Sequence, residues 1–142
     1  MSGKWSRTRL VGTVILVLFG MSIVGGYTWL KYGPENNVRM WLDKTTVKGD
    51  ESMTLYIRNL GSKSIGYGSP YYIYRINENG TETLLKFEWA WTAELRMCIP
   101  FTTRTQEIYT DISPGDYYLE KHYQIGHLGT RQFTKRLYFT IE

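Results

Sequence analysis

Residues 52–59, SMTLYIRN, contain the alternation that decides the fold class of this chain. Apolar residues alternate there with polar or amphipathic ones: Met53, Leu55 and Ile57 against Thr54, Tyr56 and Arg58. Because successive side chains of a β-strand point to opposite faces, this period of two predicts a strand with one face in a core.

Similar patterns recur on both sides of this segment. Further strands are predicted at residues 38–43, 71–76, 81–87, 101–110, 116–123 and 132–142. Turn signals separate them at intervals of about ten residues, among them Asn79-Gly80 and Pro114-Gly115. No long amphipathic helix interrupts the series. We therefore expect an all-β fold, an immunoglobulin-like antiparallel β-sandwich of about seven strands.

Two stretches of the expected sandwich are irregular. Gly66, Gly68 and Pro70 interrupt residues 65–70, which predicts an irregular edge or a crossover. Residues 88–100 fit either a helical turn around residues 93–97 or a loop that crosses between two sheets. In the strand at 101–110 we expect Arg104 and Gln106 to face solvent or the rim.

Tyr117 follows Pro114-Gly115 at the start of a late strand. This is the place of the tyrosine corner of immunoglobulin-type domains, in which the hydroxyl bonds upstream backbone while the ring packs in the core. A simple core tyrosine is the alternative. Cys98 is the only cysteine. An internal disulfide is therefore impossible, and the Cys…Trp…Cys framework of antibody domains is absent.

Residues 10–30, LVGTVILVLFGMSIVGGYTWL, carry no charge. As a helix they would be about 31 Å long, close to the thickness of the hydrocarbon core of a bilayer. Trp5 precedes the stretch, and Tyr27, Trp29 and Tyr32 lie near its end, where amphipathic aromatic rings favour the membrane interface. We predict a single transmembrane helix that contacts the lipid bilayer through residues 10–30.

The flanking charges predict the orientation of this helix. Lys4, Arg7 and Arg9 precede it without any acidic residue, whereas only Lys31 follows closely. The positive-inside rule then gives a cytoplasmic tail at residues 1–9 and an extracytoplasmic C-terminal domain. We expect an uncleaved signal anchor, with a cleaved signal peptide as the alternative.

The remaining charges exclude a nucleic-acid partner. The chain has 142 residues with 17 Lys and Arg and 13 Asp and Glu. Three of those cations precede the apolar stretch, so the rest of the chain is close to neutral and lacks a basic field for phosphates. Residues 31–37, which include the turn-rich GPENN, form a short linker, and residues 38–142 form one domain.

No pattern of catalytic or metal-binding residues is present. Phosphate-binding loops, dinucleotide fingerprints and nucleophile elbows are all missing from the sequence. His122 and His127 are five positions apart, an odd spacing, so a continuous strand would place them on opposite faces. Cys98 is expected to be a small buried side chain. We expect no enzymatic activity, no metal and no cofactor.

Two features remain as candidate sites. Asn79-Gly80-Thr81 is an N-glycosylation sequon at a predicted hairpin tip, so Asn79 is a possible glycosylation site. Trp89 and Trp91 flank Ala90 in the unassigned stretch. These tryptophans either form a contact site for a partner or cap the core of the sandwich.

Residues 38–142 resemble the prokaryotic immunoglobulin-like domains known as bacterial Ig-like. The resemblance is carried by the strand that ends at Asn59, by Tyr67-Gly68-x-Pro70, by the hairpin after Ile76, and by Pro114-Gly115-x-Tyr117-x-Leu119-x-Lys121. It implies an extracytoplasmic module without chemistry of its own. The aromatic stretch at Trp89 and Trp91 departs from the family pattern.

An apolar N-terminal helix followed by such a sandwich is also similar to archaeal pilins, archaellins and archaellum stator proteins. Prepilins usually carry a glutamate inside the apolar run, and none occurs there in this chain. We therefore expect a membrane-anchored domain that contacts an envelope or surface protein. A component of a surface filament or motor is the first alternative, and an enzyme or metal-dependent sensor on the same scaffold is the second.

Overall fold

The computed structural model describes residues 7–32, 37–87, 95–126 and 132–142. The chain divides into two compact units, Met1–Pro34 and Glu35–Glu142. Each unit is described by itself.

The first unit contains one helix, α1 (Arg7–Tyr32). Its side chains are exposed from residue 11 to residue 28, and the stretch Val11–Trp29 is long and apolar enough to cross a membrane. A cleaved signal sequence would have the same properties. The hydroxyls of Ser22 and Thr28 donate to the carbonyls of Leu18 and Val24 at 2.8 Å, so neither needs a water partner.

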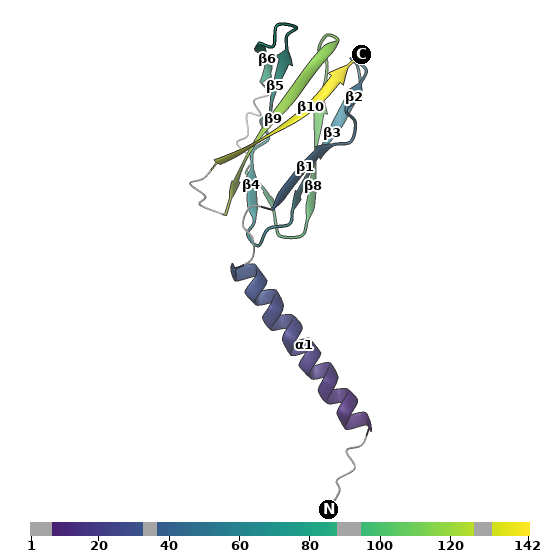
Figure 1. Ribbon diagram of the computed structural model, residues 1–142, viewed down its shortest axis with the longest axis vertical. Coiled ribbons are helices and arrows are strands. Elements are labelled where there is room, and N and C mark those ends of the chain that lie inside the picture. Colours follow the sequence, from purple (N-terminus) through teal and green to yellow (C-terminus); the bar gives the residue numbers. More distant parts are fainter. Residues whose placement is uncertain (1–6, 33–36, 88–94, 127–131) are drawn as a thin grey trace, which may run out of the picture. The chain divides into compact units, whose positions relative to one another are not determined.

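The second unit is a sandwich of two β-sheets (Figure 1). The smaller sheet contains β1 (Val38–Leu42), β3 (Ser52–Asn59) and β8 (Thr103–Tyr109). The larger sheet contains β2 (Thr46–Val47), β4 (Ile65–Tyr67), β5 (Tyr72–Ile76), β6 (Glu82–Phe87), β7 (Arg96–Cys98), β9 (Gly115–Ile125) and β10 (Gln132–Ile141). The predicted all-β sandwich is confirmed.

Strand β9 organises the larger sheet. One of its edges pairs with β10 from Gly115 to Gln124, and its other edge pairs with β5 and then with β4. Among the described strands every ladder is antiparallel except that of β2 with β10. The residues of β9 that face the other sheet are therefore the centre of the core.

The core lies between the two sheets and is built from the alternating positions that the sequence predicts. Met53, Leu55 and Ile57 are at most 1% exposed. They pack with a cluster of residues from both sheets: Val38, Val47, Ile65, Tyr67, Tyr71, Ile73, Cys98, Ile108, Tyr117, Leu119, Tyr123, Phe139 and Ile141. Burial of this apolar area supplies the stabilisation that a disulfide would otherwise add.

The structure corrects several details. Residues 65–67 are not an edge, because β4 lies between β9 and β7. The stretch Arg96–Cys98 is strand β7, so the helical turn suggested around residues 93–97 is wrong for its described part. Gln106 faces inward and is partly buried, not at the solvent face. Strand β2, absent from the predicted set, is too short to show a period.

Tyr117 forms the tyrosine corner. Its side chain is 0% exposed, its hydroxyl donates to the carbonyl of Ser113 at 2.5 Å, and its ring stacks on Phe139 with centroids 5.7 Å apart. The hydroxyl thus fixes the turn that leads into β9 while the ring fills the core. This hydrogen bond distinguishes the corner from a simple core tyrosine.

Removal of this hydroxyl should destabilise the domain without changing its shape. We expect Tyr117→Phe to lower the free energy of unfolding by about 1 kcal/mol, because the ring still packs and one buried hydrogen bond is lost. Tyr138→Phe is the control, since Tyr138 is 61% exposed. Denaturant titration followed by circular dichroism measures both, and equal stability of the two variants would contradict the corner.

Candidate functional site

The outer face of the larger sheet carries a row of tyrosines across three adjacent strands. Tyr74 on β5 stacks on Tyr118 on β9 with ring centroids 4.9 Å apart, and Tyr118 meets Tyr138 on β10 at 5.7 Å. Leu84 on β6 continues the row opposite Tyr74 and is 49% exposed. We call the surface of Tyr74, Tyr118, Tyr138, Arg136 and Glu120 the tyrosine face.

Charged groups hold these rings in place. The guanidinium of Arg136 lies 4.9 Å from the centroid of Tyr118, and its Nε donates to the Glu120 carboxylate at 3.0 Å. The Tyr118 hydroxyl donates to Glu82 Oε2 at 2.7 Å. Burial under its neighbours, and then this bond to a carboxylate, raise the pKa of Tyr118 well above its usual value. Tyr118 therefore stays protonated and remains a donor.

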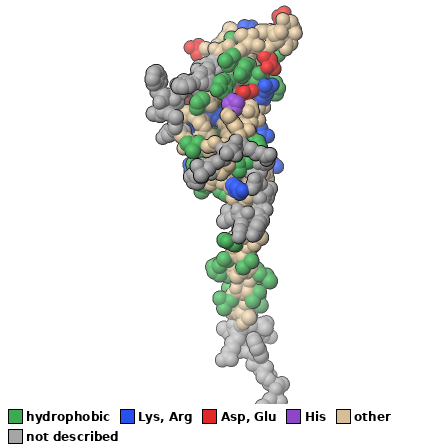
Figure 2. Space-filling view, turned by 90° about the vertical axis from the view of Figure 1, so that its left-hand side faces the viewer, with side chains coloured by type: hydrophobic (Ala, Val, Ile, Leu, Met, Phe, Trp, Pro, Cys, Tyr) green, Lys and Arg blue, Asp and Glu red, His purple; other side chains and the backbone are tan. Residues whose placement is uncertain are grey.

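His122 lies beside this cluster on the same face of β9. Its Nε2 is 3.4 Å from Glu120 Oε1, its Nδ1 is 3.0 Å from the Thr134 hydroxyl, and its ring meets the edge of Tyr72 at 5.3 Å. Figure 2 shows the purple histidine with carboxylates and cations close by and hydrophobic side chains next to them. The face thus combines exposed aromatic area with charges that are already paired.

The inner face of β9 carries an unusual residue, Lys121, whose side chain is 0% exposed. Its ammonium donates to the carbonyls of Gly68 at 2.5 Å and Pro70 at 3.0 Å, and to Gln106 Oε1 at 2.7 Å. It also lies 5.5 Å from the ring centroid of Tyr67. Burial, and to a smaller extent Arg96, lower its pKa to about 7.

A break between β4 and β5 explains why a lysine fits there. Gly66 pairs with Gln124, and Tyr72 pairs with Glu120, so this chain has two residues more than β9 over the same span. The extra residues direct backbone carbonyls towards the core, where these carbonyls accept hydrogen bonds from the Lys121 ammonium. Gly68 permits this turn, because a Cβ there would lie 2.9 Å from the ring of Pro70.

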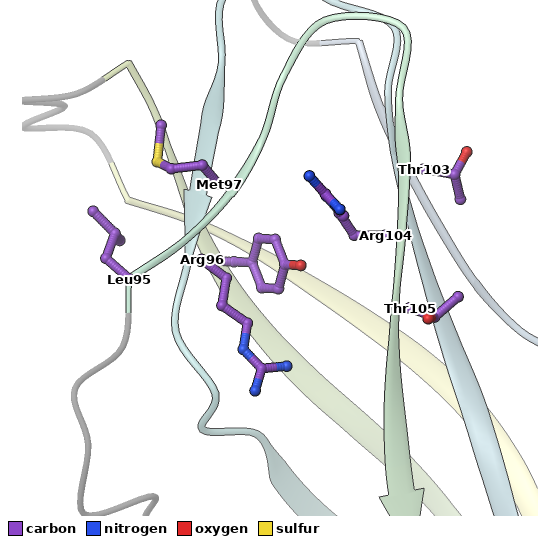
Figure 3. A pocket seen from close by; sticks show the side chains of 7 residues that line it. Leu95, Arg96, Met97, Thr103, Arg104 and Thr105 are labelled. Atoms are coloured by element: carbon purple, nitrogen blue, oxygen red, sulfur yellow. The ribbon is translucent and has the colours of Figure 1, made fainter.

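A pocket of about 490 Å³ opens between β7 and β8, the neighbouring edge strands of the two sheets. Seven residues line it: Tyr67, Leu95, Arg96, Met97, Thr103, Arg104 and Thr105. In Figure 3 Arg96 and Arg104 lie on the two strands that flank the pocket. Burial raises the pKa of Tyr67, and the positive charges of Arg96 and Arg104 partly offset this rise.

The chemistry available in this pocket is limited to contact with anions or hydroxyl groups. The seven described lining residues supply two guanidiniums, one phenol and two threonine hydroxyls, and no carboxylate, histidine or cysteine is among them. Among these seven residues the phenol of Tyr67 is the group that could exchange a proton, and burial raises its pKa further from neutrality. The seven residues thus suit binding more than proton transfer.

Asn79 lies where the sequence predicts, at the exposed tip of the hairpin between β5 and β6. Its Oδ1 accepts hydrogen bonds from the Thr81 amide at 3.0 Å and from the Thr81 hydroxyl at 2.6 Å, and Gly80 has a φ of 79°. The two polar residues of the sequon are therefore in contact and accessible. Glycosylation at Asn79 stays a prediction.

The other predicted positions are only partly placed. Trp89, Trp91 and His127 lie outside the described residues. Cys98 is a buried thiol 3.3 Å from the Thr102 carbonyl, as expected for a core side chain. Among the described residues no group of three His, Cys, Asp or Glu side chains is arranged to hold a metal ion.

Sequence reasoning missed both the tyrosine face and the buried lysine. The alternation along β9 did separate Tyr117, Leu119 and Lys121 from Tyr118, Glu120 and His122. The partners on each side, however, come from β5, β8 and β10, and their register is not visible in the sequence.

Comparisons with known proteins do not identify a family. No family model matches the chain, and neither does any curated protein. A solved target of the Northeast Structural Genomics Consortium is 18% identical over 75% of this chain and 88% of that chain, with a TM-score of 0.47.

Two further solved structures are similarly distant. The ASH/PapD-like domain 7 of human CEP192 is 13% identical over 77% of this chain and 86% of that chain, with a TM-score of 0.43. The putative ApaA protein from Bordetella pertussis is 12% identical over 73% and 88%, with a TM-score of 0.42. The fold assignment therefore rests on the strand pairing, and the resemblance to bacterial Ig-like domains stays a prediction.

The low pKa of Lys121 makes stability depend on pH. Between pH 7 and pH 9 the unfolded chain holds a proton on this lysine that the folded chain gives up, so the free energy of unfolding should rise with pH. We expect a rise on the order of 1 kcal/mol per pH unit. Denaturant titrations at several pH values measure it.

The matched variant is Lys121→Met, which keeps an unbranched side chain that is one atom shorter and removes the titrating group. The free energy of unfolding of this variant should not change with pH over the same range, whatever its absolute value. The same slope in the variant, or a flat slope in the natural chain, would contradict the assignment to Lys121.

Proposed function

We propose that this protein is a non-enzymatic, membrane-anchored Ig-like domain that binds an envelope or surface protein on the outer side of the cell membrane. The observation that carries the proposal is the tyrosine face. It presents Tyr138 to solvent, next to the exposed Leu84 and beside the ion pair of Arg136 with Glu120. Tyrosine and arginine dominate the centres of protein interfaces.

Preorganisation supports a binding role for this face. Rings that are stacked on one another and a guanidinium that is held by a carboxylate lose little conformational freedom when a partner arrives. The Glu120 side chain is only 13% exposed, so its contact with Arg136 is partly shielded from water. These features favour a surface that is built for contact.

The apolar helix supports the anchoring. Val11–Trp29 has the length and composition of a membrane span, and Lys4, Arg7 and Arg9 precede it without acidic residues. The positive-inside rule then favours a cytoplasmic N-terminus and an external domain. The lipid bilayer is thus the first proposed partner, and a protein at the tyrosine face is the second.

Protease protection tests the orientation. In spheroplasts that express the chain, externally added protease should remove residues 37–142 and leave a membrane-bound fragment that contains the helix. The reason is that the domain lies outside and the helix is shielded by lipid. Digestion only after the membrane is ruptured would contradict the proposal, and a mature chain lacking the helix would replace the anchor with a cleaved signal peptide.

Site-specific photocrosslinking tests the binding face. A photoreactive residue at position 138 should give a distinct crosslinked protein in cells, and Arg136→Ala should reduce its yield because the guanidinium orients the face. The control is the same probe at position 41, since Trp41 is 40% exposed on the outer face of the smaller sheet. Equal products from both positions, or crosslinks that Arg136→Ala leaves unchanged, would refute the tyrosine face as the binding site.

A further inference from the structure

The two ends of the sandwich differ in charge. The described residues at the end where β1 begins include no carboxylate, over residues 37–40, 58–67, 96–105, 124–126 and 132–135. Arg39, Arg58 and Lys63 lie in these segments. The carboxylates of the turns gather at the opposite end: Asp43, Asp50, Glu51, Glu78, Asp111, Asp116 and Glu142.

We call the end where β1 begins the basic end. Asn59 connects three segments of the chain there. Its side-chain amide donates to the carbonyls of Lys63 at 2.8 Å and Cys98 at 2.9 Å, and its backbone carbonyl accepts from the Phe101 amide at 2.8 Å. The next residue, Leu60, donates to the Asn37 carbonyl at 2.7 Å. The loop that carries Phe101 thus lies at the end where the chain enters the domain.

This loop presents apolar side chains to solvent. Ile99 is 52% exposed and Phe101 is 64% exposed. Phe101 has a φ of 62°, a left-handed conformation that favours glycine, and the Thr102 amide closes the turn on the Ile99 carbonyl at 3.2 Å. A phenylalanine in this place costs backbone strain, which is typical of positions selected for contact.

Two cations beside the loop, Arg39 and Arg58, have no acidic partner among the described residues. They are directly opposite in the ladder of β1 and β3. Like charges in such positions repel each other. An external anionic surface would remove this repulsion.

The covalent tether limits what can cover this end. Helix α1 ends at Tyr32 and β1 begins at Val38. Even a fully extended connection between these residues spans only about 20 Å. If α1 is embedded in a membrane, as the proposed function states, the basic end is held close to lipid headgroups.

We propose that the Ile99–Phe101 turn inserts into the interface of an anionic bilayer while Arg39, Arg58 and Lys63 contact the headgroups. Exposed apolar side chains beside cations are the combination that binds such interfaces. The inference rests on the proposed anchoring by α1. It assigns the basic end to the membrane and leaves the tyrosine face available to a protein partner.

Spin labels on the full chain test this insertion. In a Cys98→Ala background, single nitroxide labels at positions 99, 109 and 16 are compared in nanodiscs of phosphatidylcholine with phosphatidylglycerol. Tyr109 is the matched control, because it is 51% exposed at the other end of β8. The label at 99 should be shielded from a water-soluble nickel chelate and reached by oxygen, and the label at 109 should show the reverse.

The label at position 16 separates the two proposals. If the label at 16 is shielded from the nickel chelate while the label at 99 is accessible to it, the proposed insertion is wrong and the proposed anchoring stands. If the label at 16 is accessible to the chelate as well, both the insertion and the anchoring are wrong. Shielding at 99 that is equal in pure phosphatidylcholine would refute the role of the cations.

Two variants separate contact from folding. Phe101→Gly should raise the midpoint of thermal unfolding, because it relieves the strained φ, while it lowers the shielding at position 99 several-fold. Arg39→Gln with Arg58→Gln should lower the shielding only in the anionic nanodiscs. Unchanged shielding in both variants would overturn the proposal.

Discussion

The buried amino group of one lysine joins the two sheets of this domain. Lys121 projects from β9 of the larger sheet, and it bonds both Gln106 on β8 of the smaller sheet and the carbonyls of Gly68 and Pro70. A charge in a core is tolerated only where hydrogen bonds replace its hydration. The irregular connection between β4 and β5 depends on these hydrogen bonds. The side of the edge pocket that Tyr67 forms depends on this connection in turn.

The core and the two surfaces of the domain have different physical characters. The core and the Lys121 network fix the sandwich, the tyrosine face offers paired charges and aromatic area, and the basic end around Asn59 combines cations with exposed Ile99 and Phe101. In the proposed arrangement the membrane covers the basic end. A protein partner then reaches the tyrosine face from the side of the domain, without competition from lipid.

The sequence predicts the sandwich because alternation survives in its longest strands, as the buried Met53, Leu55 and Ile57 illustrate. It predicts the place of Tyr117 because a Pro-Gly turn precedes that residue. It does not predict β2, whose two residues pair in parallel with the end of β10. Nor does it predict that Tyr118, on the outer face, is buried, because its cover comes from Tyr74 and Tyr138 on other strands.

Hydrogen–deuterium exchange of the full chain tests the central claim most directly, namely that the basic end faces lipid and the tyrosine face does not. Exchange is compared between anionic nanodiscs and neutral detergent. The account predicts slower exchange in nanodiscs for residues 99–103 and 58–63, and equal exchange in both media for residues 136–140 of β10. Slower exchange of residues 136–140, with 99–103 unchanged, would contradict it.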